Sequence, residues 1–292
     1  MPAWATILLF ADFVVSVIVF PAVEKRAKHL LIPMAFFRDR TFSVEILTAS
    51  ILGGAQMAFE VHFPMWLQAI YRLSASLSGL RITPSSLLWV GVSFFVSMLT
   101  RRFSPKHLAI PIIAVQTLVY ATLLFSGTSY PIVMFHVAAG ATGTGFDIIV
   151  SSTMVVAQAV VPQEQVGAAT SMTTLGRMVG QAVLTGVFGL MFNLSVGRSL
   201  AGQRLITQTT INKAISTDSG LKAGAARKSA INSTLLTAFH FIFLLVVALF
   251  LATIVINLFY PMRTPLLKKE TSAQEARAEI AEEESGVESA DL

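Results

Sequence analysis

The chain has 292 residues, of which 54% are hydrophobic and only 13% are charged. A soluble domain carries about 25% charged residues, so water does not cover most of this surface, and long apolar runs indicate that lipid does. No cysteine is present, which excludes disulfides, thiolate metal sites and cysteine nucleophiles. The formal net charge is +5, but the basic residues sit in connections between apolar segments, so nucleic-acid binding is not indicated.

Seven apolar stretches are long enough to cross a hydrocarbon core of about 30 Å, which takes roughly 20 helical residues. A backbone in lipid must satisfy its hydrogen bonds within its own segment, and the alternation of a barrel strand is absent from the sequence, so helices are expected. The predicted fold class is all-α: a polytopic membrane protein with about seven transmembrane helices. In chain order the stretches are Ala3–Val23, Phe42–Ile70, Leu80–Thr100, His107–Ser126, Tyr130–Val161, Val166–Phe192 and Thr234–Tyr260.

The connections between these stretches differ in charge. EKRAKHLLIPMAFFRDR after the first stretch has five Lys/Arg and RRFSPKH after the third has three, whereas the short connections on the other side carry only Arg72 and Arg81. The positive-inside rule then predicts a cytoplasmic C-terminus, and the cell membrane is the expected location. The connection 193–233 carries six Lys/Arg on the opposite side, but basic charge in longer loops is a weaker topological signal.

Three segments carry family-like patterns. VPQEQVGAATSMTTLGRMVGQAVLTGVFG has a turn with Pro and Glu, then Gly-x-Ala-x-Ser, an Arg and closely spaced glycines; FPMWLQAIYRLSASLSGLRITPSSL has Pro-x-x-x-Gln before a small-residue turn and Gly-Leu. Both resemble the fourteen-helix drug:proton antiporter branch of the major facilitator superfamily. LTRRFSPKHL is similar to that family's Asp-Arg-x-Gly-x-Arg loop, but has Arg101 in place of the Asp and Ser104 in place of the Gly.

The resemblance runs from the first stretch to about residue 261 and implies the C-terminal half of a major facilitator fold. It divides the chain into an extra transmembrane helix with a cytoplasmic linker (1–41), a six-helix C-terminal transporter domain (42–261) and an acidic cytoplasmic tail (262–292). Eight of the sixteen acidic residues lie in 270–292, so the tail is predicted to be disordered. The implied partners are the lipid bilayer, small amphipathic substrates, protons and a separate N-terminal transporter half, because such transporters bind substrate between two halves.

Few ionisable groups lie inside the apolar stretches, where each is costly unless it faces an aqueous cavity or a partner. Glu60 has Gln56 one turn below, and this carboxylate beside an amide and apolar groups suits a cavity for lipophilic cations. Gln68 is placed at the outer mouth of the same pathway. A carboxylate that holds either a proton or the positive charge of a drug gives exchange by competition.

Asp147 and Arg177 lie at similar predicted depths on neighbouring helices. They are about 21 Å and 16 Å above the turn at 162–164, at a rise of 1.5 Å per residue. Three alternatives remain open at this stage: a structural ion pair, a proton site at Asp147 whose pKa Arg177 adjusts, and two groups that never meet.

Other polar and small residues in the stretches are assigned structural roles. His136 and His240 stand alone on apolar segments and are expected to be hydrogen-bonded packing residues, and Asp12 is given a structural role. The close spacing of Gly140 and Gly143, and of Gly176 and Gly180, predicts close helix approach. The sequence has no convincing metal-ligand spacing, phosphate loop or nucleophile constellation, so neither an enzyme nor a cofactor is predicted.

The favoured function is half of a transporter that exports amphipathic or cationic drugs against proton uptake. One alternative is a truncated remnant that folds without transporting, and an adjoining reading frame for six or seven more helices would argue against it. A seven-helix receptor or light sensor is less favoured, because Thr234–Tyr260 contains no lysine for a retinal and the chain has no cysteine.

Overall fold

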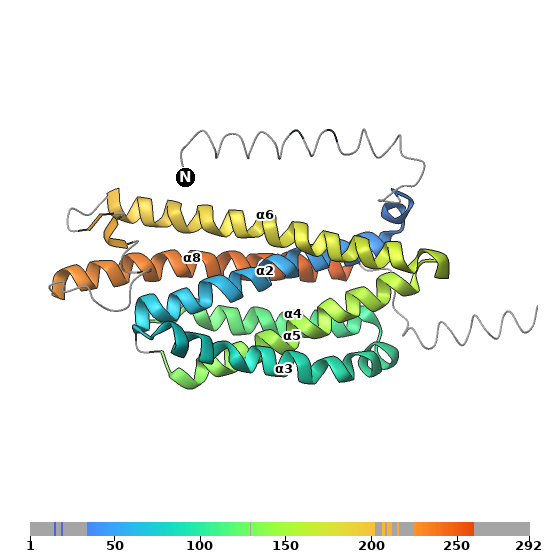
Figure 1. The fold of residues 1–292 in the computed structure, drawn as a ribbon, viewed down its shortest axis with the longest axis horizontal. Helices are drawn as coiled ribbons and strands as arrows, with labels where there is room; N and C mark the ends of the chain where they lie inside the picture. Colours follow the sequence, from blue (N-terminus) through green and yellow to red (C-terminus); the bar gives the residue numbers. More distant parts are fainter. Residues whose placement is uncertain are drawn as a thin grey trace, which may run out of the picture.

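The computed structural model describes residues 34–128, 130–201 and 225–259, with Val15, Val19 and a few positions between 206 and 215. Within these residues six helices are long and apolar enough to cross a membrane, and Figure 1 shows them side by side along the long axis. They are α2 (Arg40–Tyr71), α3 (Ala75–Arg102), α4 (Pro105–Leu124), α5 (Ile132–Ala159), α6 (Val166–Ala201) and α8 (Ala225–Leu258), with short 3-10 helices at η1 (Met34–Arg38) and η2 (Gln163–Gln165).

The all-α membrane fold is confirmed, and each predicted stretch from Phe42 onward corresponds to one of these helices. The first stretch, Ala3–Val23, lies outside the described residues except for Val15 and Val19, and Asp12 and the acidic tail lie outside them as well.

Two predicted connections are wrong in extent. Arg81 was placed in a loop, but it lies inside α3, because that helix begins at Ala75, where the Ser74 hydroxyl accepts from the amide of Leu77. The connection 193–233 was also overestimated, since α6 continues to Ala201 and α8 already begins at Ala225. Both errors have one cause: hydropathy marks the residues that suit lipid, whereas helical hydrogen bonding continues beyond them into the interface.

The six helices form two units of three, α2–α3–α4 and α5–α6–α8. The most extensive packing is between α2 and α6 and between α3 and α5, and each of these pairs joins the first helix of one unit to the second helix of the other. The third helices, α4 and α8, also pack together. An odd number of antiparallel helices reverses the chain direction, so the two units have opposite orientations, as in the inverted repeats found in many transporters.

The bundle core is richest in aromatic rings near the end of α2. Trp66 is fully buried and its ring packs edge-on against Phe135 of α5 and Phe243 of α8, with centroids 5.2 and 5.4 Å away. Offset and edge-to-face rings are the favoured aromatic arrangement. These contacts hold the two units together at this end of the bundle.

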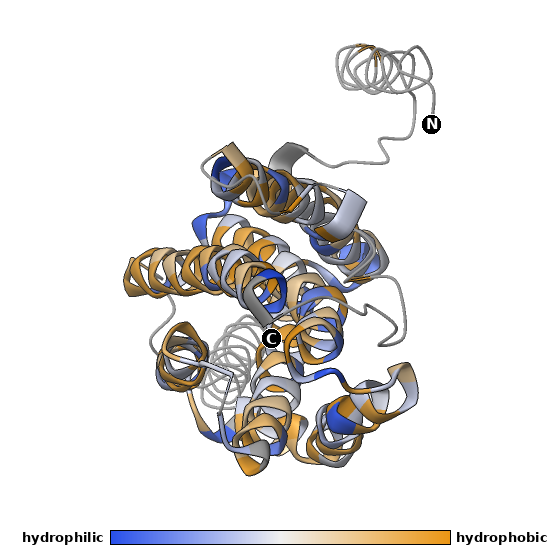
Figure 2. Cartoon of the chain, turned by 90° about the vertical axis from the view of Figure 1, so that its left-hand side faces the viewer, coloured by the Kyte–Doolittle hydropathy of each residue, from blue (hydrophilic) through white to orange (hydrophobic). Residues whose placement is uncertain are grey.

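The outside of the bundle is as apolar as its core. Figure 2 shows hydrophobic residues on the outer surfaces of the helices as well as between them, and Phe94 on α3 and Leu118 on α4 are 81% and 68% exposed. Large contiguous apolar surfaces are rare on monomeric soluble proteins. The chain is therefore built for a surrounding bilayer.

Candidate substrate and proton pathway

The only acidic side chain on an exposed part of α2 beyond its first turn is Glu60, among the residues that the structure describes. Its Oε1 accepts a hydrogen bond from Nε2 of Gln56, at 2.8 Å. Glu60 lies eleven residues before the end of the helix, or about 16 Å at 1.5 Å per residue, which places it near the middle of a membrane. A carboxylate at that depth needs water or a partner.

Pro64 leaves a backbone carbonyl without its usual donor in the same part of α2. It lies inside the helix and has no N–H, so the carbonyl of Glu60 cannot receive the usual bond from the residue four positions on. A carboxylate, an amide and an under-used carbonyl therefore lie within one turn of α2. Acceptors without matching donors favour a cation or a proton.

Gln68 follows two turns after Glu60 and is half-buried. Eight residues of helix correspond to about 12 Å along the axis and a rotation of about 80°, so Gln68 lies further toward the end of α2 and to one side of Glu60. By contrast, His62 is 5% exposed and lies edge-on to Phe188 of α6, with centroids 6.0 Å apart. Two residues of helix correspond to a rotation of about 200°, so His62 and Glu60 lie on opposite faces of α2.

Asp147 is buried at the interface of α5 and α3. Its side chain accepts two hydrogen bonds, from the hydroxyl of Ser93 on α3 at 2.9 Å and from that of Ser151 at 3.1 Å. Hydrogen bonds to a charged group are stronger than neutral ones, so two hydroxyls provide part of the solvation that burial removes. Ser93 was not among the residues singled out in the sequence.

Arg177 lies at a different interface, between α6 and α2. A Cβ at Gly53 would lie 2.7 Å from its Cγ, and Arg177 is half-buried. No ion pair joins Arg177 to Asp147 in the part of the chain that the structure describes, since the carboxylate faces the serines of α3 and α5. The sequence left three alternatives open for these two residues, and in the structure Asp147 and Arg177 do not meet.

The glycine pairs lie where helices cross. A Cβ at Gly143 would overlap the backbone carbonyl of Ser85 on α3, and one at Gly180 would overlap that of Ser50 on α2. At Gly140 and Gly176 the nearest atoms are side chains, of Leu88 and Ile46, at 2.9 and 2.8 Å. The hydroxyl of Ser50 also donates to the carbonyl of Gly176, at 2.8 Å. Gly143 and Gly180 are thus the positions at which the two main crossings require glycine.

His136 and His240 make hydrogen bonds, as expected of packing residues. His240 contacts the carbonyl of Ser126 at 2.9 Å, and His136 contacts Nη1 of Arg81 at 3.0 Å. Within the described ranges no three His, Asp or Glu side chains lie together as a metal site would require.

Sequence reasoning overlooked several buried polar groups. Gln116 of α4 donates through Nε2 to the carbonyl of Ala141 on α5 at 2.6 Å, and Asn257 of α8 donates to the hydroxyl of Thr48 on α2 at 2.9 Å. Glu45, 5% exposed near the start of α2, was also overlooked. Each of these residues is a single polar group in an apolar run. That pattern could have identified them, because such groups form hydrogen bonds between helices in lipid.

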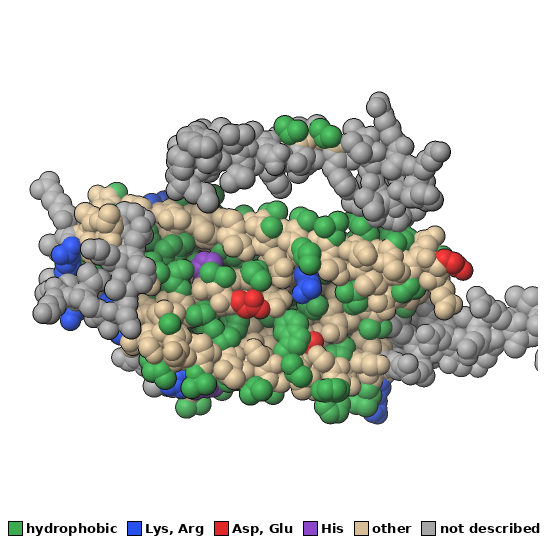
Figure 3. Space-filling view, in the orientation of Figure 1, with side chains coloured by type: hydrophobic (Ala, Val, Ile, Leu, Met, Phe, Trp, Pro, Cys, Tyr) green, Lys and Arg blue, Asp and Glu red, His purple; other side chains and the backbone are tan. Residues whose placement is uncertain are grey.

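Figure 3 shows one long face of the bundle, on which the few charged side chains stand singly among hydrophobic and uncharged groups. This pattern separates the site from the charged clefts of most soluble enzymes. It is the distribution expected where isolated ionisable groups mark a pathway through a membrane.

Known proteins resemble this chain in sequence. The family model of the Major Facilitator Superfamily matches residues 3–185. The multidrug transporter protein MdtP of Bacillus subtilis is 24% identical over 200 residues, which are 68% of this chain and 37% of that protein. The multidrug efflux pump SdrM of Staphylococcus aureus is 26% identical over 195 residues, 65% of this chain and 43% of that protein.

A solved structure has the same arrangement of helices. It is a bacterial homologue of the human lysosomal transporter Spinster in an inward-facing, occupied conformation, with a TM-score of 0.60 and 16% identity. The match covers 77% of this chain and 50% of that one, so this fold corresponds to about half of that structure. The chain likewise spans less than half the length of the two bacterial relatives.

Within the described residues, six helices of membrane-spanning length in two units of opposite orientation define a multi-pass membrane protein. The chain belongs to the Major Facilitator Superfamily.

Proposed function

We propose that residues 42–261 form the C-terminal half of a proton-coupled exporter of amphipathic or cationic compounds, of the fourteen-helix drug antiporter branch. Residues 1–41 supply an extra helix and linker, and 262–292 form a cytoplasmic tail. A separate N-terminal half completes the pathway in the cell membrane. The names of the two bacterial relatives, a multidrug transporter and a multidrug efflux pump, support the class of substrate.

One observation carries this proposal: the Glu60 carboxylate is exposed near mid-depth, where it accepts a hydrogen bond from the amide of Gln56. A charged group is not stable against lipid tails. The other half of the transporter, or the water between the halves, therefore covers Glu60. In family terms this is the place where substrate binds between the halves.

Exchange at Glu60 follows from charge balance. A protonated carboxylate is neutral and has no charge with which to hold a cation, whereas the ionised form attracts a lipophilic cation in the low dielectric of the pathway. Proton and drug therefore compete for one group. Asp147 provides a second carboxylate, which accepts hydrogen bonds from the hydroxyls of Ser93 and Ser151.

The test uses the chain reconstituted in liposomes with the N-terminal half of its transporter. Drug-driven proton release is followed with a pH dye for Glu60→Gln, Asp147→Asn and, as matched control, Glu164→Gln, whose acid is exposed in the η2 turn outside the spanning helices. Release should be lost in Glu60→Gln and reduced in Asp147→Asn, and should be normal in the control. Unchanged coupling in both membrane variants would reject the proposal.

A further inference from the structure

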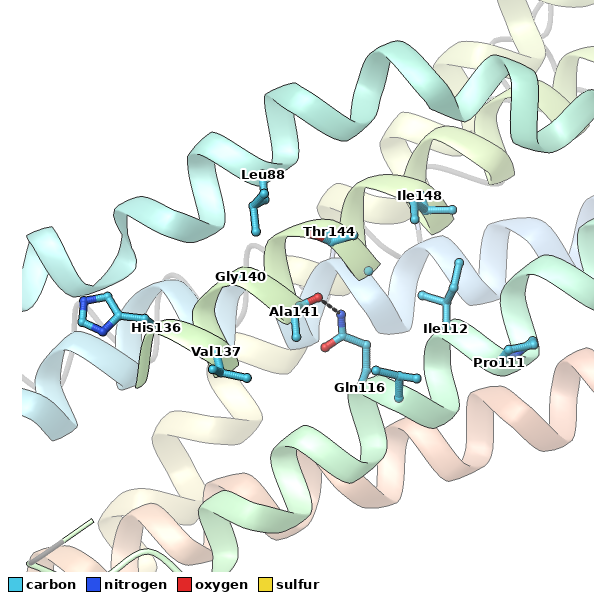
Figure 4. A pocket seen from close by; sticks show the side chains of 12 residues that line it. Leu88, Pro111, Ile112, Gln116, His136, Val137, Gly140, Ala141, Thr144 and Ile148 are labelled. Atoms are coloured by element: carbon cyan, nitrogen blue, oxygen red, sulfur yellow. Dashed lines mark hydrogen bonds between the residues drawn. The ribbon is translucent and has the colours of Figure 1, made fainter. Parts of the chain in front are cut away.

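A groove separates α3 from α4, and α5 forms its floor. Its volume is about 480 Å³, within the range of roughly 300–1,000 Å³ that is usual for small-molecule sites. Figure 4 shows Leu88 of α3 pointing into it from one side, Ile112 and Gln116 of α4 on the other, and Gly140 on the floor. The groove is separate from Glu60 and Asp147, neither of which lines it.

The groove is long and mostly apolar. Along α5 its lining runs from His136 to Ile148, twelve residues or about 18 Å of helix. Leu88, Val115 and Val137 line it and are themselves 45%, 54% and 54% exposed, so the groove opens along its side. Since the surrounding surface of α3 and α4 is apolar, this opening faces the tails of bilayer lipids.

The His136 end of the groove is positively charged. Nη1 of Arg81 lies 3.0 Å from Nε2 of His136. Arginine can only donate hydrogen bonds, so the guanidinium is the donor in this contact. The Nε of Arg81 is buried without a hydrogen-bond partner, and no carboxylate of the described segments forms an ion pair with this guanidinium.

An arginine within a spanning helix needs an anion or a route to the interface. Arg81 lies six residues from the start of α3, about 9 Å along the helix, which is close to the level of lipid head groups. Arginine binds phosphate through two parallel N–H donors. The charge of Arg81, which has no carboxylate partner among the described residues, is complementary to a phosphodiester.

We propose that this groove binds an anionic phospholipid of the surrounding bilayer. One acyl chain lies along α5 from His136 toward Ile148, and the head-group phosphate accepts hydrogen bonds from Arg81. Binding requires only that the chain is folded in a membrane or micelle, so the proposal does not depend on drug export or on a second transporter half.

The head-group arm of the test uses the full purified chain in detergent micelles. Native mass spectrometry counts bound dioleoyl phosphatidylglycerol and dioleoyl phosphatidylcholine, added in equal amounts. A basic residue near an anionic membrane surface contributes about 1 kcal/mol, so we expect a preference of about fivefold for phosphatidylglycerol. Arg81→Gln should remove the preference, and Arg81→Lys should keep most of it.

The matched charge control is Arg102→Gln, which removes an exposed arginine from the other end of the same helix. It lowers the net charge by the same amount and should leave the preference unchanged. A preference that persists in Arg81→Gln, or that falls equally in Arg102→Gln, would overturn the assignment of the head-group site.

The acyl-chain arm fills the groove. Val115→Phe adds a ring at its mouth, whereas Leu118→Phe makes a similar enlargement on the same helix at a residue that is 68% exposed and does not line the groove. Binding of phosphatidylglycerol should fall severalfold in Val115→Phe alone. Elution as a single peak on size exclusion verifies that both variants are folded, and equal binding by the two would contradict the groove as the site.

Discussion

The two three-helix units have the same arrangement but differ at one helix pair. In α5–α6–α8 the second and third helices pack along each other, whereas in α2–α3–α4 the corresponding helices, α3 and α4, hardly touch. The groove with Arg81 and His136 lies at this gap. The helix crossings that the units share hold the bundle together, whereas the gap between α3 and α4 leaves room for the groove.

The shared features are the two crossings of α2 with α6 and of α3 with α5. Each brings a glycine against the backbone carbonyl of a serine: Gly180 against Ser50 and Gly143 against Ser85. Such contacts give van der Waals packing in a medium where no hydrophobic effect drives helices together. The predictions below test this equivalence.

The largest effect is expected at the crossings. Gly180→Ala and Gly143→Ala should each destabilise the fold by about 1–3 kcal/mol, because the added methyl group overlaps a backbone carbonyl and forces the helices apart. Thermal unfolding of the purified protein in detergent measures the loss. If only one variant is destabilised, the two crossings are not equivalent.

The controls for this prediction are Gly186→Ala on α6 and Gly91→Ala on α3, where a Cβ would meet nothing within 4 Å. Both should unfold at or slightly above the temperature of the original protein, since alanine favours helix over glycine by about 1 kcal/mol in peptides. A loss as large as at the crossings would refute the packing argument.

A smaller effect is expected at Asp147, whose partners have no counterpart in the other unit. Ser93→Ala removes one of the two hydroxyls that donate to the carboxylate, and hydrogen bonds to charged groups contribute about 1.5–3 kcal/mol. Titration with a denaturing detergent should show this loss. Ser97→Ala, one turn further along α3 and exposed, should show none.

The smallest effect should come from the polar bridges to the third helices. Gln116 joins α4 to α5 and Asn257 joins α8 to α2. In each case the third helix of one unit is joined to the first helix of the other unit. Replacement of either by alanine should cost about 0.6 kcal/mol, the average for a hydrogen bond between membrane helices. A cost several times larger at only one of them would show that the bridges are not equivalent.

Sequence predicted which segments are helices because apolar runs of this length have one stable form in lipid. It could not place their ends, as α3 shows: Ser74 caps the helix at Ala75, five residues before the apolar run begins. It also misassigned Arg81, because a charged residue at the edge of a run fits a loop and a helix end equally well.

The site was predictable in its residues and not in their contacts. The rise per residue gave similar depths for Asp147 and Arg177, but depth along an axis does not fix the direction in which a side chain points. That direction follows from how the helices are rotated against one another, and the structure turns Asp147 toward Ser93 and Arg177 toward Gly53. Gln56 and Glu60, one turn apart on one helix, needed no such information, and they meet.

The most direct test of the account asks whether Glu60 faces water in the assembled transporter. The chain has no cysteine, so Glu60→Cys and Leu118→Cys each create one reactive thiol without background. A charged thiosulfonate that cannot enter lipid reacts with the thiolate, which does not form against apolar surroundings. Glu60→Cys should be modified at least about tenfold faster than Leu118→Cys, and equal, slow modification of both would contradict the proposed pathway.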